Sequence, residues 1–321
     1  MTRAIVAQAT GGPEVLTLEE VTPPEAGAGE LLVETAAVGV NFIETYQRSG
    51  LYRVPFPFTP GAEAAGRVIA IGAGVAGFAE GDLIATAEAH ASYAERFVVA
   101  AERAVRVPEG IAPETAAALP LQGLTAHYLA TSAARPEPGD TVLVHAGAGG
   151  VGLLLTQLLT ARGVRVLTTA STPEKQALSR EAGAAEVLDY AGFAERAREL
   201  TDGAGVAVVY DGVGKDTFDD SLRALRVRGT LVLFGAASGP VPPFDLQRLN
   251  AGGSLSVTRP SLGHFLRTAE ERAWRYGELF SAIAAGTLDV RIGARFPLAE
   301  AADAHRALEG RATTGKVILL P

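Results

Sequence analysis

The sequence predicts a two-domain α/β protein, in which a barrel-like antiparallel β domain is joined to a doubly wound parallel sheet. Three observations support this fold class. The chain has 321 residues, which is too long for one ordinary core. Residues 1–122 contain short strand-like runs separated by turns. Strand and helix patterns then alternate regularly over about 120 residues, which is typical of a doubly wound sheet.

The first part of the chain has the short apolar runs and turn residues of antiparallel strands. Residues 51–60 interrupt these runs with three prolines and three aromatic residues, which predicts a loop that exposes some apolar surface. The strand-like runs are Ile5–Ala7, Leu31–Val38, Arg67–Gly72 and Gly81–Ala85.

The pattern changes near residue 112, where helical periodicity begins. Pro113–Leu119 and Leu124–Ala134 predict two helices, and a proline-rich turn follows them. The strands expected after this turn are Thr141–His145, Arg165–Thr169, Glu186–Leu188, Val206–Tyr210, Thr230–Phe234 and Ser254–Val257. The helices expected between them are Gly150–Arg162, Pro173–Ala182, Ala194–Thr201 and Asp216–Leu225.

The C-terminal part contains a long helical pattern, Phe265–Ala285, followed by short strands that include Lys316–Leu320. Strands that follow an α/β run most simply return to the first domain, which makes that domain discontinuous. We therefore predict a β domain formed by residues 1–122 and 261–321, and a nucleotide-binding domain formed by residues 123–260.

The composition narrows the classes of function. Hydrophobic residues make up 48% of the chain and charged residues 20%, so a substantial core is expected. A net charge of −8 opposes general binding to nucleic acid or to anionic membranes. Neither a bilayer-spanning run nor a signal-peptide pattern is present, which predicts a cytoplasmic protein without membrane partners. The absence of cysteine excludes disulfides, thiolate nucleophiles and cysteine-based zinc sites.

A glycine-rich motif, Gly147-Ala148-Gly149-Gly150-Val151-Gly152, lies between the strand pattern at 141–145 and an apolar helix pattern. A pyrophosphate binds at a helix N-terminus, where unpaired N–H groups point outward and the helix dipole is positive. Glycine is needed there because side chains would block this approach. The motif in this context predicts a dinucleotide site whose residues include Gly147, Gly149, Gly150, Val151 and Gly152.

The segment after the second expected strand predicts which nicotinamide cofactor binds. NAD-specific folds place an acidic residue there to bond the ribose 2′-hydroxyl. This chain instead has Ser171 and Thr172, followed by Lys175 in the first turn of a helix. Neutral hydroxyls and a cation suit a 2′-phosphate, provided that Glu174 points away, so NADPH is predicted. The alternative for Lys175 is an ordinary solvated lysine.

Several segments in one order along the whole chain carry a family resemblance. They are Gly11–Leu16, Val40–Tyr46, Ser49–Tyr52, Gly61–Gly66, Gly123–Ala126, His145–Gly152, Val208–Gly214, Val257–Leu262 and Arg311–Lys316. Together they resemble the quinone oxidoreductase (zeta-crystallin-like) branch of the medium-chain dehydrogenase/reductase superfamily, in its bacterial form. The resemblance implies a GroES-like β-barrel catalytic domain, a Rossmann NADPH-binding domain, and a homodimer or tetramer.

Two positions distinguish this branch from the zinc alcohol dehydrogenases that it resembles. Asn41 stands where those enzymes have a zinc-binding cysteine, and Ala62 stands where they have a zinc-binding histidine. The five histidines of the chain show no metal-ligand spacing. We therefore expect no metal site.

Without a Lewis acid, the substrate must already accept electrons readily. The resemblance implies NADPH-dependent quinone reduction, by one-electron steps that give a semiquinone. A reductase of activated carbon–carbon double bonds in enones or alkenals is the nearest alternative. Relatives that bind AU-rich RNA suggest a nucleic-acid-binding protein as an alternative of another class, against which the net charge of −8 argues.

The resemblance also implies roles for individual residues. Phe42 to Tyr46 form a loop under the nicotinamide, where Asn41 and Tyr46 offer hydrogen bonds, and Tyr52 contacts a flat quinone ring. Asn41 as a turn residue and the two tyrosines as packed aromatics are equally simple explanations. Catalytic contacts are assigned to Asn41, Tyr46, Tyr52 and Arg259. Further cofactor contacts are assigned to Tyr128, Gly150, Val151, Ser171, Thr172, Lys175, Tyr190, Phe234, Gly235, Ala236, Ala237, Arg259, Pro260, Ser261 and Arg311.

Overall fold

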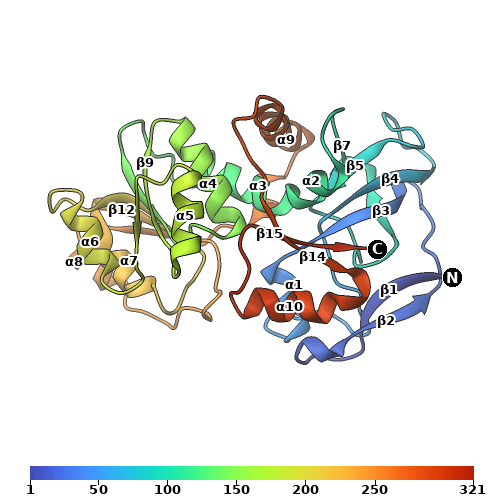
Figure 1. Cartoon of the computed structure of the whole chain (residues 1–321), viewed down its shortest axis with the longest axis horizontal. Helices are drawn as coiled ribbons and strands as arrows, with labels where there is room; N and C mark the ends of the chain where they lie inside the picture. The colour runs from blue at the N-terminus through green and yellow to red at the C-terminus, as the bar shows by residue number, and fades with distance from the viewer. The chain divides into compact units, whose positions relative to one another are not determined.

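The computed structural model describes all 321 residues and divides the chain into two units (Figure 1). Met1–Gln122, Thr268–Gly286 and Val290–Pro321 form the first unit. Gly123–Arg267 and Thr287–Asp289 form the second. The first unit holds a mainly antiparallel sheet and the second a parallel sheet with helices, so the predicted fold class is confirmed.

The sheet of the second unit has six strands in the order β10-β9-β8-β11-β12-β13, and all neighbouring pairs are parallel. Strand β11 is buried along its whole length, as expected for a strand with helices on both faces of its sheet. The strands are β8 (Thr141–Val144), β9 (Arg165–Thr169), β10 (Glu186–Leu188), β11 (Val206–Asp211), β12 (Leu225–Leu233) and β13 (Ser256–Thr258). The helices are α4 (Gly150–Ala161), α5 (Pro173–Glu181), α6 (Phe193–Glu199), α7 (Phe218–Ala224) and α8 (Gln247–Ala251).

This strand order reverses between β8 and β11, which are neighbours in the sheet although β9 and β10 lie between them in the sequence. Loops after the two strands therefore leave the same sheet edge in opposite directions. In open α/β sheets, ligands bind in the crevice outside this reversal point, at the carboxyl ends of the strands. The glycine-rich motif follows β8 directly, so the fold places it at the expected edge.

The first unit is built around β3 (Glu30–Val40), which pairs antiparallel with β4, β6 and β15. Its sheet runs in the order β14-β15-β3-β4-β5-β7, and only β14 and β15 pair in parallel. Strands β1 and β2 form a separate hairpin. The other strands are β1 (Thr2–Ala7), β2 (Leu16–Val21), β4 (Ala64–Ile71), β5 (Leu83–Thr86), β6 (Arg96–Ala100), β7 (Val105–Arg106), β14 (Ile292–Pro297) and β15 (Lys316–Leu320).

Side chains from both ends of the chain form the core of the first unit. Leu31, Val33 and Val38 of β3 pack with Val317 and Leu319 of β15 in one buried cluster. Successive side chains of a strand point to opposite faces, so Val317 and Leu319 enter this core while Ile318 enters a second buried cluster. The helices of this unit are α1 (Phe42–Arg48), α2 (Pro113–Ala118), the start of α3 (Pro120–Tyr128), α9 (Ala269–Ala284) and α10 (Ala301–Glu309).

The predicted helix Phe265–Ala285 needs correction, and the second unit runs to Arg267, whereas the predicted domain boundary lies at residue 261. Helix α9 begins at Ala269 because the Thr268 side chain caps it, accepting a hydrogen bond of 3.2 Å from the Glu271 amide. The preceding segment stays with the second unit, where the Phe265 ring stacks on the Tyr128 ring at a centroid distance of 4.3 Å.

Two predictions of local structure also differ from the structure. The helix predicted over Leu124–Ala134 is α3 followed by a π-helical turn at Leu129–Ala133. The loop expected at Phe42–Tyr46 is helix α1, because Asn41 and Glu44 have the spacing of a capping box, which starts a helix. No helix combines the length and apolarity needed to cross a membrane.

Candidate functional site

The start of α1 is fixed by a buried carboxyl group. The backbone N–H of Asn41 donates to Glu44 Oε2 at 2.8 Å, while Glu44 Oε1 has no hydrogen-bond partner. Burial raises the pKa of Glu44 to about 8, against the opposing effect of the Lys316 ammonium. Glu44 is therefore a neutral acid at pH 7, and it adds no negative charge to the interior.

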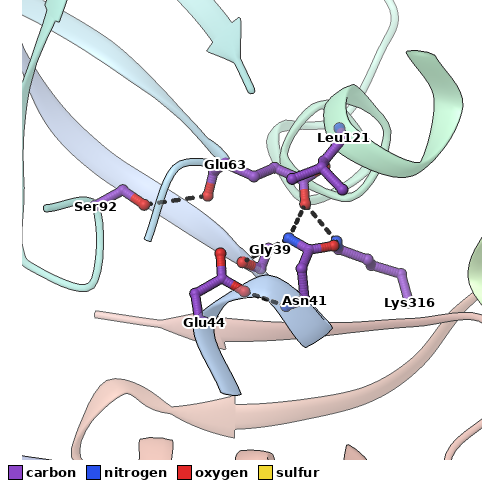
Figure 2. Close-up of polar contacts among 7 residues, drawn as sticks. All are labelled: Gly39, Asn41, Glu44, Glu63, Ser92, Leu121 and Lys316. Atoms are coloured by element: carbon purple, nitrogen blue, oxygen red, sulfur yellow. Dashed lines mark hydrogen bonds and ion pairs between the residues drawn. The ribbon is translucent and has the colours of Figure 1, made fainter. Parts of the chain in front are cut away.

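A second group of buried polar residues lies beside Glu44 (Figure 2). This Lys316 cluster consists of the Lys316, Asn41 and Glu63 side chains and the Leu121 backbone amide. The Lys316 ammonium bonds both Asn41 Oδ1, at 2.6 Å, and Glu63 Oε2. Asn41 Nδ2 donates to Glu63 Oε2 at 2.8 Å, and the Leu121 N–H donates to Glu63 Oε1 at 2.7 Å. All the polar atoms of the Glu63 carboxylate and the Asn41 amide thus have partners.

The Lys316 cluster is closed to solvent, since Lys316 is 1% exposed and Glu63 is fully buried. Gly39 makes room for it, because a Cβ at that position would overlap the Glu63 carboxylate. The cation on one side and the carboxylate on the other fix the orientation of the Asn41 amide. The hydrogen bond that we predict between Asn41 and the nicotinamide side of the site remains a prediction, and the observed contacts favour a positioning role.

Sequence reasoning missed Lys316, Glu63 and Glu44. A signal for the first two was present: Lys316 precedes an apolar strand, and Glu63 is the one charged residue within Gly61–Gly66. A charged residue that borders an apolar, glycine-rich run is a candidate for a buried ion pair.

The other end of α1 is also fixed by polar groups, all buried except the exposed Glu309. Arg48 donates to Glu309 Oε1 at 2.6 Å and contacts His305 Nδ1 at 3.1 Å, while His305 Nε2 lies 3.1 Å from the Tyr93 hydroxyl. Burial and the Arg48 cation lower the pKa of His305 to about 3, so this imidazole is neutral. Because arginine only donates, His305 accepts at Nδ1 and donates from Nε2 to Tyr93.

Helix α1, fixed at both ends, carries aromatic residues that are partly exposed. The Tyr46 ring lies 6.1 Å from the Phe42 ring and 5.4 Å from the Tyr52 ring, and the Tyr52 amide donates to the Tyr46 carbonyl at 3.0 Å. Tyr52 is 41% exposed. The structure therefore brings the predicted residues Phe42, Tyr46 and Tyr52 together as one group of rings suited to contact a flat molecule.

In the second unit, the glycine-rich loop has the geometry of a phosphate cradle. A Cβ at Gly147 would overlap the Thr168 and Ser179 side chains, and a Cβ at Gly152 would overlap the Ala146 carbonyl. Helix α4 begins at Gly150, and no side chain caps its first turn. The N–H groups at this helix start can therefore bind an anion, so the loop fits the pyrophosphate of a dinucleotide.

The residues predicted for the 2′-phosphate lie just after β9. The Thr172 side chain caps α5 by accepting from the Lys175 amide at 3.3 Å, which places Lys175 in the first turn of the helix. Glu174 is exposed, and hydrogen bonds from its own backbone amide and from Thr172 lower its pKa. Ser171 is exposed beside them, and the Tyr190 ring stacks against the His145 ring.

The segments predicted to line the nicotinamide follow β12 and β13. The Arg259 guanidinium donates to the Leu233 carbonyl at 3.1 Å, which brings Arg259 beside Phe234 at the start of the partly exposed segment Phe234–Ala237. Pro260 and Ser261 follow on the same edge of the sheet.

The cofactor contacts predicted for Tyr128 and Arg311 stay predictions. Tyr128 is buried at the end of α3, with its ring stacked on Phe265. Arg311 is exposed in the first unit, with left-handed backbone at φ 55° directly after α10.

The chain matches two family models. The model of the alcohol dehydrogenase GroES-like domain matches residues 27–135, and the model described as zinc-binding dehydrogenase matches residues 150–276. The two matches correspond to the mainly antiparallel sheet and the parallel sheet.

Comparison with known proteins identifies relatives over the full length of the chain. A quinone oxidoreductase of Pseudomonas aeruginosa is 47% identical over all of both chains. A solved structure of a mycobacterial protein complexed with NADPH is 54% identical, with a TM-score of 0.97, covering 99% of this chain and all of that one. A 2-haloacrylate reductase of a Burkholderia species is 38% identical, covering all of this chain and 99% of that one. The chain therefore belongs to the quinone oxidoreductase family of the medium-chain dehydrogenase/reductase superfamily.

Proposed function

We propose that the protein reduces quinones with NADPH, without zinc and in one-electron steps. The observation that carries this proposal is the glycine-rich loop, whose missing side chains and uncapped helix start fit a dinucleotide pyrophosphate. Full-length similarity to a quinone oxidoreductase and to a structure complexed with NADPH supports the choice of substrate and cofactor. NADPH, when bound, supplies two electrons and one proton from its nicotinamide ring.

The residues of the chain would bind and orient the reactants. The N–H groups at the start of α4 hold the pyrophosphate, and Ser171, Thr172 and Lys175 receive the 2′-phosphate. The segment Phe234–Ala237 and Arg259 bind near the nicotinamide. The rings of Phe42, Tyr46 and Tyr52, which are tilted by 33° and 64° to one another, offer aromatic contacts to a quinone.

The purified protein is expected to oxidise NADPH in the presence of quinones, with NADH as a poorer donor. In one-electron reduction, one NADPH and two quinones give NADP⁺, one proton and two quinone radical anions. In two-electron reduction, one NADPH, one proton and one quinone give NADP⁺ and one hydroquinone. Absorbance at the NADPH band together with electron paramagnetic resonance distinguishes the two. If no quinone in a broad panel supported NADPH oxidation, the proposal would be contradicted.

Replacing Lys175 with alanine is expected to weaken NADPH binding roughly tenfold, because one charge-assisted hydrogen bond to the 2′-phosphate is lost. NADH binding should stay unchanged, since NADH lacks that phosphate. Dissociation constants from cofactor fluorescence measure both effects. Arg180→Ala, which removes a cation from the last turn of the same helix, is the matched control. Equal losses for NADPH and NADH would show that Lys175 does not select the cofactor.

The Lys316 cluster supports the zinc-free part of the proposal. Its ammonium bonds both Asn41 and Glu63, so a divalent cation at these side chains would meet an existing positive charge. Activity is therefore expected to survive dialysis against a chelator. Loss of activity that added zinc restores would contradict this expectation.

A reductase of activated carbon–carbon double bonds is the second candidate, favoured by the similarity to a 2-haloacrylate reductase. An enone or alkenal panel that gives saturated products faster than quinones are consumed would favour it. We also propose a homodimer formed through edge strands of the parallel sheet, which light scattering would test. The cytoplasmic location expected from the sequence remains a prediction.

A further inference from the structure

A chain of buried hydrogen bonds runs beneath the glycine-rich loop of the second unit. His145 Nδ1 lies 3.0 Å from Thr169 Oγ1, and His145 Nε2 lies 2.9 Å from Ser221 Oγ. Ser221 Oγ donates to Asp211 Oδ2 at 3.0 Å, and the Ala146 N–H donates to Thr169 Oγ1 at 3.2 Å. We call these groups the His145 chain. His145, Thr169, Ser221 and Asp211 are all buried, so water does not compete for their bonds.

The chemistry of the groups fixes the direction of every bond. A carboxylate only accepts, so the single hydroxyl proton of Ser221 is used on Asp211. Ser221 must then accept from His145, which requires a proton on Nε2. In a neutral imidazole this leaves Nδ1 as an acceptor, so Thr169 donates to it. All the hydrogen bonds of the His145 chain therefore run in one direction, with the Ala146 amide as the first donor and the Asp211 carboxylate as the last acceptor.

The surroundings of His145 favour the neutral imidazole that this direction requires. Burial lowers the pKa of His145 and outweighs the Asp211 carboxylate, which acts in the opposite direction. The ring packs between aromatic groups, with Phe193 at a centroid distance of 4.7 Å and Tyr190 at 6.2 Å. A second proton on the ring would make both nitrogens donors and leave the Thr169 hydroxyl proton without its acceptor.

The His145 chain joins two segments that we assign to cofactor binding. At one end, Ala146 begins the glycine-rich loop with a left-handed backbone, φ 52°, which is unfavourable for alanine. At the other end, Asp211 Oδ1 accepts from the Val213 and Gly214 amides at 2.8 and 2.9 Å. The Asp211 carbonyl also accepts from the Phe234 amide at 2.8 Å. The pyrophosphate loop and the Phe234–Ala237 segment are thus tied to the two ends of one chain of bonds.

We propose that His145 is a positioning residue that couples the glycine-rich loop to the Asp211–Gly214 loop and so sets the affinity for NADPH. The imidazole does not contact the cofactor in this proposal. It holds Thr169 and Ser221 in one hydrogen-bond direction, which keeps the Ala146 amide and the Asp211 loop in place before NADPH binds. The affinity part rests on the proposed function, whereas the direction of the chain does not.

The tautomer of His145 in the cofactor-free protein tests the chain directly. Nitrogen-15 NMR of histidine-labelled protein at pH 7 distinguishes the two neutral tautomers and the imidazolium. The signal that disappears in the His145→Gln variant belongs to His145. We expect a neutral ring with its proton on Nε2. A proton on Nδ1, or on both nitrogens, would overturn the proposal.

The affinity part is tested at the two hydroxyl groups on either side of the imidazole. Thr169→Val and Ser221→Ala are each expected to weaken NADPH binding about tenfold, which corresponds to about 1.4 kcal/mol. The double variant should bind no more weakly than about tenfold below wild type, because either change already breaks the chain. Thr156→Val is the matched control, since the buried Thr156 hydroxyl has no hydrogen-bond partner.

The outcomes separate this proposal from the proposed function. If the wild-type protein binds NADPH while Thr169→Val and Ser221→Ala bind as tightly as Thr156→Val, the coupling is wrong. A wild-type protein that does not bind NADPH contradicts the proposed function and with it the affinity part. The NMR result still decides the direction of the chain in that case. Melting temperatures of all variants show whether each variant is folded under the conditions of the binding measurement.

Discussion

Replacing Lys316 with methionine is expected to lower the free energy of unfolding by about 3–5 kcal/mol, the usual cost of removing one partner from a buried ion pair. The Glu63 carboxylate would keep its bonds from Asn41 Nδ2 and the Leu121 amide but lose its counter-ion. A fully buried carboxylate without a cation is strongly disfavoured. Urea unfolding followed by circular dichroism measures the loss.

A double variant, Glu63→Gln with Lys316→Met, is the control for charge. It removes both ions together, and neutral side chains of similar volume restore stability when a buried pair is replaced whole. We therefore expect the double variant to recover most of the loss. Glu63→Gln alone should be destabilised, because it leaves the ammonium buried without its carboxylate. A double variant as unstable as the lysine variant would show that the contacts of Lys316, and not its charge, hold this region.

Glu44 is expected to make stability depend on pH. In the unfolded chain its carboxyl loses a proton near pH 4.5, whereas the folded protein keeps the proton until about pH 8. Between these values the folded state binds more protons than the unfolded state, so each rise in pH lowers the free energy of unfolding by up to about 1.4 kcal/mol per unit. The stabilisation is complete below pH 4.5 and is lost as pH rises through about 8.

Glu44→Gln removes this titration while keeping an oxygen that can accept from the Asn41 amide. Relative to wild type, the variant should therefore gain stability as pH rises from 5 to 8, by an amount on the order of a few kcal/mol. Unfolding in urea at a series of pH values measures the difference, in which the titrations of other groups cancel. Glu25→Gln, at an exposed position, is the matched control. Curves that stay parallel for Glu44→Gln and wild type would show that the buried carboxyl does not titrate in this range.

The parallel sheet was predictable because its signals are local. Each strand of the second unit is a short apolar run, and the helix after β8 is preceded by glycines at the required spacing. Longer-range packing changed the ends of these elements. Because Thr268 caps it, α9 begins at Ala269, which is later than the apolar pattern predicts. The stack of Phe265 on Tyr128 keeps residues 261–267 with the second unit.

The site was only partly predictable for the same reason. The glycine-rich loop and Lys175 lie within short segments whose chemistry is visible in the sequence. The Lys316 cluster joins residues separated by 253 positions, and the His145 chain joins residues 76 positions apart. No local pattern indicates such pairs, because burial and partner choice depend on the completed fold. Helix α1 was predictable in principle from the Asn41–Glu44 spacing. The family resemblance implied a loop at Phe42–Tyr46 instead.

Strand β15 has a consequence for synthesis on the ribosome. It lies inside its sheet, between β14 and β3, although it follows β14 and the whole second unit in the sequence. The second unit can form as soon as Asp289 has emerged, whereas the nascent first unit holds Glu63 without its cation and leaves the pairing edge of β3 open. A chain arrested before Lys316 would therefore carry a finished nucleotide-binding unit beside an open sheet edge, which is a substrate for chaperones. Pairing of β15 with β3 then closes that edge and brings Lys316 to the buried carboxylate in one step.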